Sequence, residues 1–252
     1  MKIAIISDIH GNIEALNAVL QDIENQKAEK IFICGDLAMA GADPEKTVDK
    51  IIELINRKKA VCILGNTDEM ILKSSGTYGD GYTPGDKTMA ASLKYSKQIL
   101  RPNQIEFLKN LPLQHSERIG KLEILLVHGS PRKIGENIFP DLDEKILKEI
   151  VSGVKEDIIF CGHTHLPVVH KVDEKTIVNV GSVGRPFTKN PDACYAIFDY
   201  PDLDSKDFEI SHRYVKYDKE TTAKKLESLP HEGGEKLARV ILNPEERFVL
   251  FP

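Results

Sequence analysis

Five short polar clusters, each directly after an apolar run of strand-like length, constrain this chain more than any other feature. Their side chains offer oxygen atoms and imidazole nitrogens, the atoms that bind metal ions in proteins. In chain order the clusters are Asp8-Ile9-His10, Gly35-Asp36, Gly65-Asn66-Thr67-Asp68, His128-Gly129 and Gly162-His163-Thr164-His165. Any one of them alone would mean little, but five in series favour a single site built from strand ends.

The first 65 residues predict three parallel strands joined by two helices. Apolar runs at 2–6, 31–34 and 60–64 are typical of buried strands. After Asn12, a favoured N-cap residue, apolar residues recur at helical spacing, and Asp43-Pro44-Glu45 opens a second helix. This βαβαβ order calls for parallel strands with right-handed crossovers. We therefore expect the first three clusters at one carboxyl edge, where α/β sheets build their sites.

Residues 69–112 interrupt this alternation. They begin with a turn-rich stretch over residues 74–85 that is unsuited to a strand or a helix. Because long loops in compact domains are often functional, this insertion could form a lid over the site, with Tyr78 and Tyr82 contacting the substrate. The alternative is a surface excursion whose tyrosines only pack, and the sequence leaves both open.

The rest of the chain predicts further strands and a helical tail. Helices are expected near 86–100, from Pro102, near 143–151 and after Asp218. Strands are expected near 113–119, 121–127, 158–161, 167–172, 176–180, 194–200 and 208–216. No internal repeat or low-complexity linker occurs. We expect one domain over residues 1–252, with a peripheral helical tail over 218–252.

The net charge of the chain weighs against some classes of binding partner. The formal net charge is −5, so the overall field opposes general binding of nucleic acid or anionic membranes. A local positive pocket for phosphate is compatible with that charge, because bound divalent cations would supply one. We expect neither nucleic acid nor membrane as a partner, and the sequence leaves the oligomeric state open.

The positions of the cysteines and the N-terminal sequence indicate the cellular compartment of the protein. The cysteines are widely separated and lie in or beside apolar runs, at Cys34, Cys62, Cys161 and Cys194. This pattern is typical of buried free thiols in a reducing compartment. A strand begins at Lys2 without a signal peptide, and no apolar run approaches the ~20 residues of a membrane span. Both observations predict a cytoplasmic protein.

The polar clusters contain enough ligands for two metal ions. Asp8 and His10 are alternate residues after a strand, so both side chains can point the same way. Asp36 has two oxygens that can bridge two ions, and Asn66 adds a neutral amide. Imidazoles complete the set, at His128, His163 and His165. Four ligands per ion follow if Asp36 is shared, which leaves open positions for water and phosphate.

Taken singly, these residues have ordinary structural explanations. Asp8 could cap a helix, Asn66 could form a turn, and His128 could be a core histidine. All five clusters in this order make that explanation weak, and carboxylate with imidazole suits borderline metals such as Mn²⁺, Fe, Zn²⁺, Co²⁺ and Ni²⁺.

From Met1 to about Pro186, the chain resembles the calcineurin-like metallophosphoesterases, most closely the prokaryotic branch of phosphodiesterases and diadenosine-tetraphosphatases. The segment from Asn179 to Arg185 also resembles this branch. The resemblance implies an α/β (α+β) fold, a four-layer α-β-β-α sandwich with two mixed central sheets flanked by helices. It also implies two divalent transition-metal ions, with Mn²⁺ favoured and Fe, Zn²⁺, Ni²⁺ or Co²⁺ as alternatives. One ion would be bound by Asp8, His10, Asp36 and His165, and the other by Asp36, Asn66, His128 and His163.

The implied reaction is hydrolysis of a phosphodiester or phosphomonoester in a small phosphorylated substrate, nucleotides included. A hydroxide bridging the two metals would attack phosphorus, with Asp36, Asn66 and His128 as the catalytic set. Arg132 and Arg185 are candidate phosphate clamps, because guanidinium groups match phosphate oxygens. The alternative for each arginine is a surface ion pair.

One departure from the family concerns Thr67. Many members carry a histidine there, which donates a proton to the leaving group, whereas a threonine hydroxyl makes a poor general acid. Water, a metal-bound ligand or another histidine could supply the proton instead, and aryl or phosphoanhydride leaving groups need less protonation, so the range of leaving groups stays open. Asp68 would either orient Thr67 or cap the following helix.

Two other functions share this fold. A protein-interaction scaffold loses metal-ligand side chains, whereas here all seven are present. A nuclease shares the ligands, but the acidic charge and the lack of an evident DNA-binding extension weigh against it.

Overall fold

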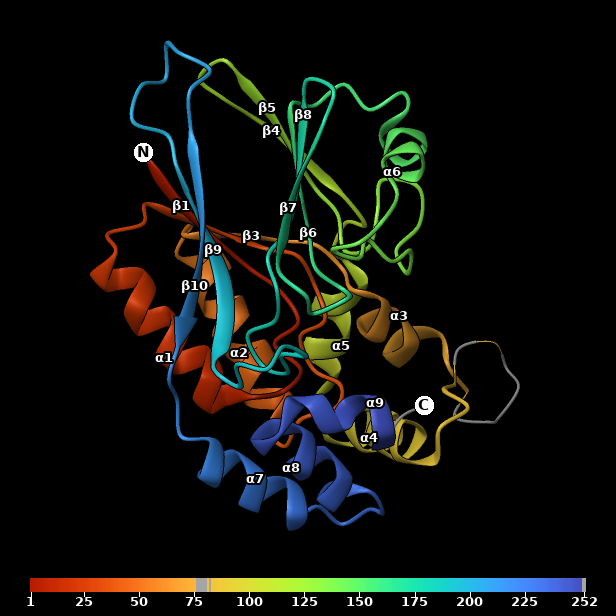
Figure 1. Cartoon of the computed structure of the whole chain (residues 1–252). Helices are drawn as coiled ribbons and strands as arrows, with labels where there is room; N and C mark the ends of the chain where they lie inside the picture. Colours follow the sequence, from red (N-terminus) through yellow and green to blue (C-terminus); the bar gives the residue numbers. More distant parts are fainter. Residues whose placement is uncertain (76–80, 82, 251–252) are drawn as a thin grey trace.

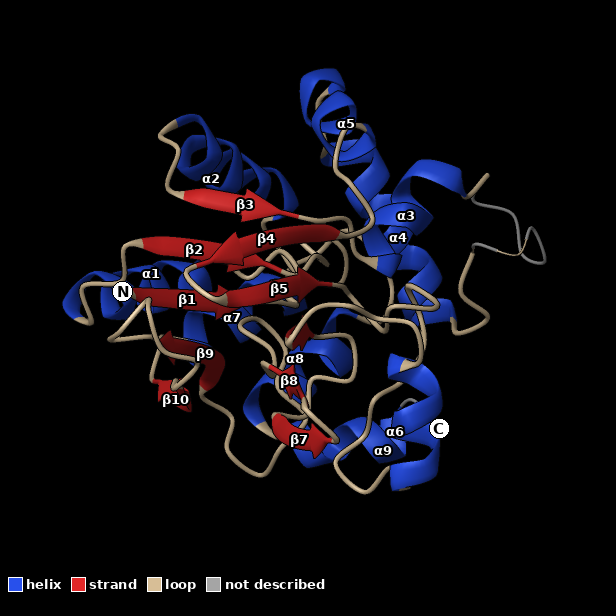
Figure 2. Ribbon diagram, turned by 90° about the horizontal axis from the view of Figure 1, so that it is seen from above, coloured by secondary structure: helices blue, strands red, loops and turns tan. Residues whose placement is uncertain are grey.

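Two five-stranded mixed sheets form the centre of the molecule (Figure 1). The computed structural model describes residues 1–75, 81 and 83–250. The first sheet has the strand order β10-β9-β1-β2-β3, which Figure 2 shows as a row. Its strands are β1 (Lys2–Ile6), β2 (Lys30–Ile33), β3 (Ala60–Cys62), β9 (Ala193–Asp199) and β10 (Glu209–Val215).

The predicted βαβαβ unit is confirmed. Strands β1, β2 and β3 are parallel neighbours, joined by α1 (Ile13–Asn25) and α2 (Pro44–Asn56). The side chain of Asn12 caps α1 by accepting a hydrogen bond from the Ala15 amide at 3.1 Å. Pro44 stands in the first turn of α2, where its missing N–H costs nothing. The carboxyl ends of all three strands therefore point to one edge.

The second sheet repeats this arrangement with different connections. Its order is β4-β5-β6-β8-β7, in which β5, β6 and β8 are parallel. The strands are β4 (His115–Ile119), β5 (Leu122–Leu126), β6 (Ile158–Cys161), β7 (Val168–Val172) and β8 (Lys175–Asn179). The fourth and fifth polar clusters follow β5 and β6 directly, at the edge that faces the first three.

Buried apolar side chains divide the molecule into layers. Phe32 and Phe198 of the first sheet meet Phe160 of the second in one core between the sheets. A second core lies between the first sheet and the helices α1 and α2, and a third between the second sheet and α6 (Glu144–Val151). Figure 1 shows α1 and α6 on opposite outer sides. The predicted four-layer sandwich is confirmed.

The described parts of residues 69–112 are mainly helical, as predicted for 86–100 and from Pro102. The helices are α3 (Asn66–Lys73), α4 (Lys87–Ile99) and α5 (Pro102–Lys109). Helix α3 contacts both α4 and α5. Tyr78 and Tyr82, on which the lid hypothesis depends, lie outside the described residues.

The chain after β10 forms α7 (Lys219–Glu227), α8 (Gly234–Leu242), a 3-10 turn (Pro244–Glu246) and α9 (Arg247–Leu250). Leu226 and Leu237 belong to the same buried core as the apolar faces of α1 and α2. Lys225 contacts both Glu14 and Asp43. The tail is thus packed against the first half of the domain.

Two further expectations concern cysteines and membranes. All four cysteines are buried and form no disulfide, as predicted. Among the described residues, no helix combines the length and apolar character needed to cross a bilayer.

Candidate metal centre

The structure brings all seven predicted metal ligands to one edge of the two sheets. They follow β1, β2, β3, β5 and β6, and are Asp8, His10, Asp36, Asn66, His128, His163 and His165. Each of the seven side chains lies 3.7 Å or less from a candidate ligand that follows another strand. These contacts form two groups.

The first group contains Asp8, His10 and His165, whose ligand atoms all lie within 4.8 Å of one another. Asp8 Oδ1 is 3.1 Å from His165 Nε2 and 3.7 Å from His10 Nε2. The two Nε2 atoms are 3.1 Å apart. Three electron-rich atoms thus converge on a small, buried volume.

Hydrogen bonds to backbone carbonyls fix the tautomers of these imidazoles. His10 Nδ1 lies 2.8 Å from the Met39 carbonyl, and His165 Nδ1 contacts the Arg185 carbonyl. Since a carbonyl only accepts, each Nδ1 carries the proton, and in the neutral ring each Nε2 presents its lone pair to the cluster. A divalent cation between these atoms is the chemistry that such a donor set fits.

The second group contains Asp36, Asn66, His128 and His163. Asn66 Oδ1 lies 2.8 Å from His128 Nε2 and 2.9 Å from His163 Nδ1. Asp36 Oδ1 is 3.5 Å from His128 Nε2, and its Oδ2 is 3.7 Å from His10 Nε2. The two oxygens of one carboxylate therefore face the two groups.

His128 is held like His10 and His165. Its Nδ1 donates to the Cys34 carbonyl over 2.6 Å, which directs Nε2 toward Asn66 and Asp36. Burial disfavours its charged form, but the Asp36 carboxylate outweighs burial and raises the pKa of His128 to about 10. Without a bound metal ion, His128 is therefore protonated at neutral pH and carries a positive charge beside Asp36.

The carboxylates are ionised in this surrounding. Burial opposes the charge on Asp8 and on Asp36, but neighbouring imidazoles outweigh it. They hold the pKa of Asp8 well below its usual range and lower that of Asp36 to about 2. Asp8 Oδ1 accepts no hydrogen bond of good geometry within the described part of the chain. A buried, negatively charged oxygen in this state fits a metal ligand.

The backbone at the site is unusual. Five of the candidate ligands have left-handed φ values near +50 to +67°: Asp8, His10, Asp36, His163 and His165. Such conformations are uncommon for residues with a Cβ, and they concentrate at functional sites. They turn the chain sharply after each strand, so that side chains separated by one residue both face the cluster.

Two glycines permit the close approach of these loops. A Cβ on Gly65 would lie 2.1 Å from Asp36 Oδ1, and a Cβ on Gly162 would lie 2.3 Å from Asp8 Oδ2. Any other residue at either place would displace a candidate ligand.

The model of the Calcineurin-like phosphoesterase superfamily domain matches residues 1–202 of this chain. The chain belongs to the calcineurin-like phosphoesterase superfamily. The predicted resemblance is confirmed over the region that carries every polar cluster.

Two relatives of this phosphoesterase come from an archaeon and a bacterium. An uncharacterized protein of Methanocaldococcus jannaschii is 34% identical over 255 residues, which cover 93% of this chain and 96% of the relative. Phosphodiesterase YfcE of Escherichia coli is 26% identical over 207 residues, 79% of this chain and 88% of the relative. The family match and this relative support a metal-dependent phosphoesterase.

Solved structures resemble the chain along nearly its whole length. A hypothetical protein of Pyrococcus horikoshii has a TM-score of 0.82 at 27% identity, covering 95% of this chain and 97% of its own. A metallophosphoesterase of Sphaerobacter thermophilus has a TM-score of 0.75 at 26% identity, covering 96% and 99%. Both matches include residues beyond 202, so the C-terminal tail also resembles these structures.

Sequence reasoning gave no role to several residues that support the phosphoesterase site. Asn179 donates to the Gly162 carbonyl over 2.6 Å, and Ser182 Oγ donates to the Asp8 carbonyl over 2.8 Å. Both lie in the segment 179–185. The resemblance of this segment to the family was the sequence signal that could have identified them. Asp68 accepts hydrogen bonds from the amides of Gly65 and Leu37, which confirms its capping role.

The predicted substrate contacts differ in position. Arg185 is almost fully buried next to the metal ligands, since its carbonyl contacts His165. Arg132 is instead paired with Glu136, four residues later in the sequence, through a 3.0 Å contact from Nε. The structure thus places Arg185 in the site and Arg132 in an ion pair, while Tyr78 and Tyr82 lie outside the described residues.

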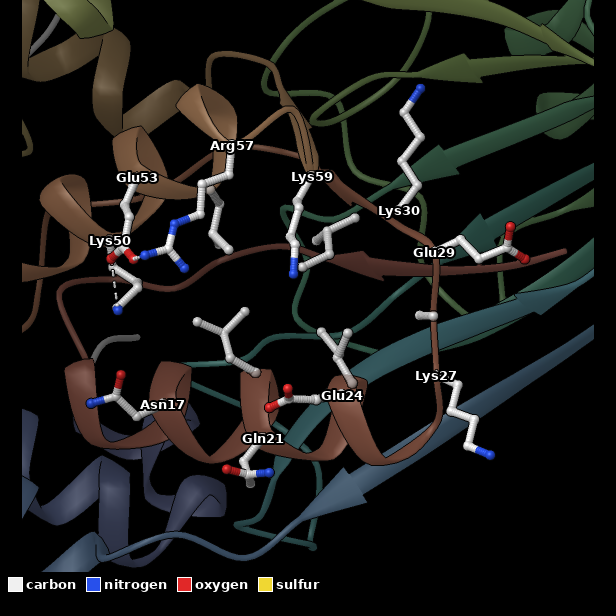
Figure 3. Close-up of a pocket in the computed structure, with 15 residues that line it drawn as sticks. Asn17, Gln21, Glu24, Lys27, Glu29, Lys30, Lys50, Glu53, Arg57 and Lys59 are labelled. Atoms are coloured by element: carbon white, nitrogen blue, oxygen red, sulfur yellow. Dashed lines mark hydrogen bonds and ion pairs between the residues drawn. The ribbon is translucent and has the colours of Figure 1, made fainter.

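A groove of about 750 Å³ lies at the opposite edge of the first sheet (Figure 3). It is lined by α1, α2 and the amino ends of β2 and β3. Glu53 pairs there with Lys50 at 2.9 Å and with Arg57 at 2.7 Å. None of the candidate ligands lines this groove.

Proposed function

We propose that this phosphoesterase hydrolyses a phosphodiester or phosphomonoester of a small substrate at a centre that holds two divalent transition-metal ions. The observation that carries the proposal is the position of Asp36. Its Oδ1 lies 3.5 Å from His128 and its Oδ2 lies 3.7 Å from His10. One carboxylate between two sets of imidazoles suits a bridging ligand.

The donor set indicates the kind of ion. Asp8, His10, Asp36 and His165 would hold one ion, and Asp36, Asn66, His128 and His163 the other. Mixed oxygen and nitrogen ligands favour Mn²⁺, Fe, Zn²⁺, Co²⁺ or Ni²⁺ over Ca²⁺, and we propose Mn²⁺ first. When bound, such ions act as Lewis acids that neutralise phosphoryl oxygens and lower the pKa of water.

The chain's own groups fix the geometry around the reaction. Backbone carbonyls at Cys34, Met39 and Arg185 orient three imidazoles, so little rearrangement is needed for binding. The amide of Thr67 donates to Asp36 Oδ1 over 2.8 Å, and that of His163 donates to Asp8 Oδ2 over 2.9 Å. Both carboxylates are thereby held at defined angles.

Proton supply to the leaving group sets the range of substrates. The Thr67 hydroxyl is nearly buried, makes no hydrogen bond within the described residues and is too weak an acid to protonate an alkoxide. Burial, with the Asp36 charge, raises the pKa of Asp68 to about 7. Its two oxygens, however, are occupied by backbone amides. We therefore propose that good leaving groups, aryl or phosphoanhydride oxygens, are preferred.

The test is metal-dependent hydrolysis. The protein is stripped with a chelator, reloaded with Mn²⁺ and assayed with bis-p-nitrophenyl phosphate, while elemental analysis counts the bound ions. We expect about two ions per chain and hydrolysis that depends on them, both lost in Asp36→Ala. Full activity of that correctly folded variant, or no hydrolysis of any phosphoester by the loaded protein, would overturn the proposal. A plasmid-nicking assay separates a nuclease from a small-molecule enzyme.

A further inference from the structure

Asn12, which caps α1, has a side chain whose hydrogen bonds reach several separate parts of the chain. The residue is 2% exposed to solvent, so its amide group depends on partners within the protein. Its Oδ1 accepts a hydrogen bond from the Ala15 amide at 3.1 Å and lies 3.2 Å from Thr222 Oγ1. Its Nδ2 donates to the Gly184 carbonyl over 2.9 Å and lies 3.3 Å from Tyr217 Oη. Capping of α1 accounts for only one of these contacts.

The orientation of the Asn12 side chain follows from its partners. The Ala15 amide only donates, so the atom that faces it is the oxygen Oδ1. The Gly184 carbonyl only accepts, so the atom that faces it is the nitrogen Nδ2. Serine is an equally good N-cap residue, but its single hydroxyl cannot occupy both places. Asparagine therefore does more here than a cap requires.

The Gly184 peptide connects this side chain to two candidate ligands of the first group. The Gly184 amide donates to the Asp8 carbonyl over 2.9 Å. The next residue, Arg185, provides the carbonyl that orients His165. A Cβ on Gly184 would lie 1.8 Å from the Ile9 carbonyl oxygen, so the two loops are in close contact. A displacement of the Gly184 carbonyl would therefore move Asp8 and His165 as well.

The C-terminal part of the chain reaches the same point. Tyr217 follows β10, and Thr222 lies in α7, which contacts α1 (Figure 1). Both residues lie beyond residue 202, where the match to the family model ends. Lys225 of α7 contacts Asp43 over 2.7 Å, and the Asp43 amide donates to the Gly11 carbonyl over 2.9 Å. The C-terminal segment is thus attached at two points to the loop that follows β1.

We propose that Asn12 is a positioning residue for the first group of metal ligands, and that Tyr217 and Thr222 hold it, so that the C-terminal segment sets the affinity of this group for its ion. Residues that orient metal ligands change metal affinity by about 10- to 100-fold when they are replaced. This inference rests on the proposed function, because it requires that the site binds metal ions.

The effect should be confined to one of the two ions. Within residues 1–75, 81 and 83–250, the side-chain contacts of Asn12 lead to the loops of the first group and to the C-terminal segment. The imidazole of His128 is instead oriented by the Cys34 carbonyl, in the loop after β2. The second group therefore keeps its own support when Asn12 is replaced.

The experiment is a calorimetric titration of Mn²⁺ into the metal-free protein. Asn12→Ser keeps a favoured N-cap residue and removes the donor to Gly184. We expect one ion to bind about 10-fold more weakly or worse, and the other to stay within about twofold of the wild type. Unchanged affinities in Asn12→Ser, or equal weakening of both ions, would refute the positioning role.

Tyr217→Phe is a milder variant that tests the contribution of the C-terminal segment. It keeps the aromatic ring and removes only the hydroxyl beside Asn12. We expect the same ion to bind about twofold more weakly or worse, the effect of one lost neutral hydrogen bond. This variant decides the proposal by itself if Asn12→Ser does not fold, and wild-type affinity for both ions would contradict it.

Tyr195→Phe is the matched control, because it removes a tyrosine hydroxyl near the other end of α1. That hydroxyl donates to Asp22 over 2.7 Å. A hydrogen bond to a charged group contributes more than a neutral one, so thermal unfolding of the metal-free protein should show at least as large a destabilisation as in Tyr217→Phe. Both Mn²⁺ affinities should nevertheless equal those of the wild type. An equal loss of affinity in the two tyrosine variants would indicate general loosening of the fold and overturn the proposal.

Hydrolysis of bis-p-nitrophenyl phosphate is measured separately on the same proteins. A wild type that binds two ions but hydrolyses no phosphoester would refute the proposed reaction, and the titration would still decide the role of Asn12. A wild type that binds no divalent ion would overturn both proposals.

Discussion

At the amino ends of β2 and β3, the groove of Figure 3 is lined by acidic and basic side chains that face each other, as Glu53 faces Lys50 and Arg57. At the carboxyl edge of the same sheet, Asp8 and Asp36 are buried among imidazole side chains. The carboxylate of Glu53 at the groove has two cationic partners on its own helix or just after it, whereas the buried carboxylates at the carboxyl edge fit a metal cation. The comparison shows that buried carboxylates locate this site better than the volume of a groove does.

The largest expected difference between the two edges is in catalysis. Asp8→Asn and Glu53→Gln are the same chemical change at opposite edges. Asp8→Asn removes a ligand charge from the metal centre, so we expect hydrolysis of bis-p-nitrophenyl phosphate to fall by at least about 100-fold. Glu53→Gln should retain activity within twofold. Comparable losses in the two variants would remove the distinction between the edges.

The next difference is in stabilisation by metal. Binding at 100 times the dissociation constant stabilises a folded protein by about 2.7 kcal/mol, or roughly 5–10 °C for a domain of this size. Wild type and Glu53→Gln should both show this shift in thermal unfolding when Mn²⁺ is added. Asp8→Asn should show little of it, and an undiminished shift there would place the ions elsewhere.

A third difference concerns pH in the metal-free protein. The pKa of His128 is about 10, above the ~6.5 of an unfolded histidine. The stabilisation from its charge is therefore complete below pH 6.5 and is lost as pH rises toward 10, by at most about 1.4 kcal/mol per pH unit.

Thermal unfolding between pH 7 and 10 measures this loss. The slope should flatten in His128→Gln. His212 is a suitable control, because burial lowers its pKa and it is neutral throughout this range. A His212→Gln variant should therefore keep the wild-type slope, and a His128→Gln variant with that same slope would contradict the assignment.

The smallest effect is expected at the groove. Glu53 is exposed to solvent and its ion pairs are screened. Glu53→Gln should shift the midpoint of thermal unfolding by less than about 4 °C. A larger shift, removed by high salt, would show that the groove charges act as a cooperative network.

The parallel βαβαβ unit and the positions of the candidate ligands after strands could be predicted because both depend on local signals. An apolar run followed by a polar cluster locates Asp8, Asp36 and His128 without knowledge of the rest of the chain. The ion pair of Arg132 also has a local signal, since Glu136 follows four residues later.

Other features depend on contacts that no local pattern shows. The left-handed backbone at Asp8 is supported by Ser182 and by the Gly184 amide, which donates to the Asp8 carbonyl over 2.9 Å. These partners lie more than 170 residues away in sequence. The meeting of Arg247 with Phe187 is equally distant from any motif, because only the path of the tail brings them together.

The carbonyl contacts of the three oriented imidazoles have a consequence for how the cell loads this protein. Cys34 and Met39 lie in the loop after β2 and Arg185 lies in the loop after β8, so each imidazole also joins its own loop to another. The orientation of each imidazole is thus set by a contact within the chain. Since the mixed donors of the site accept several transition metals, local supply during synthesis would select the resident ion.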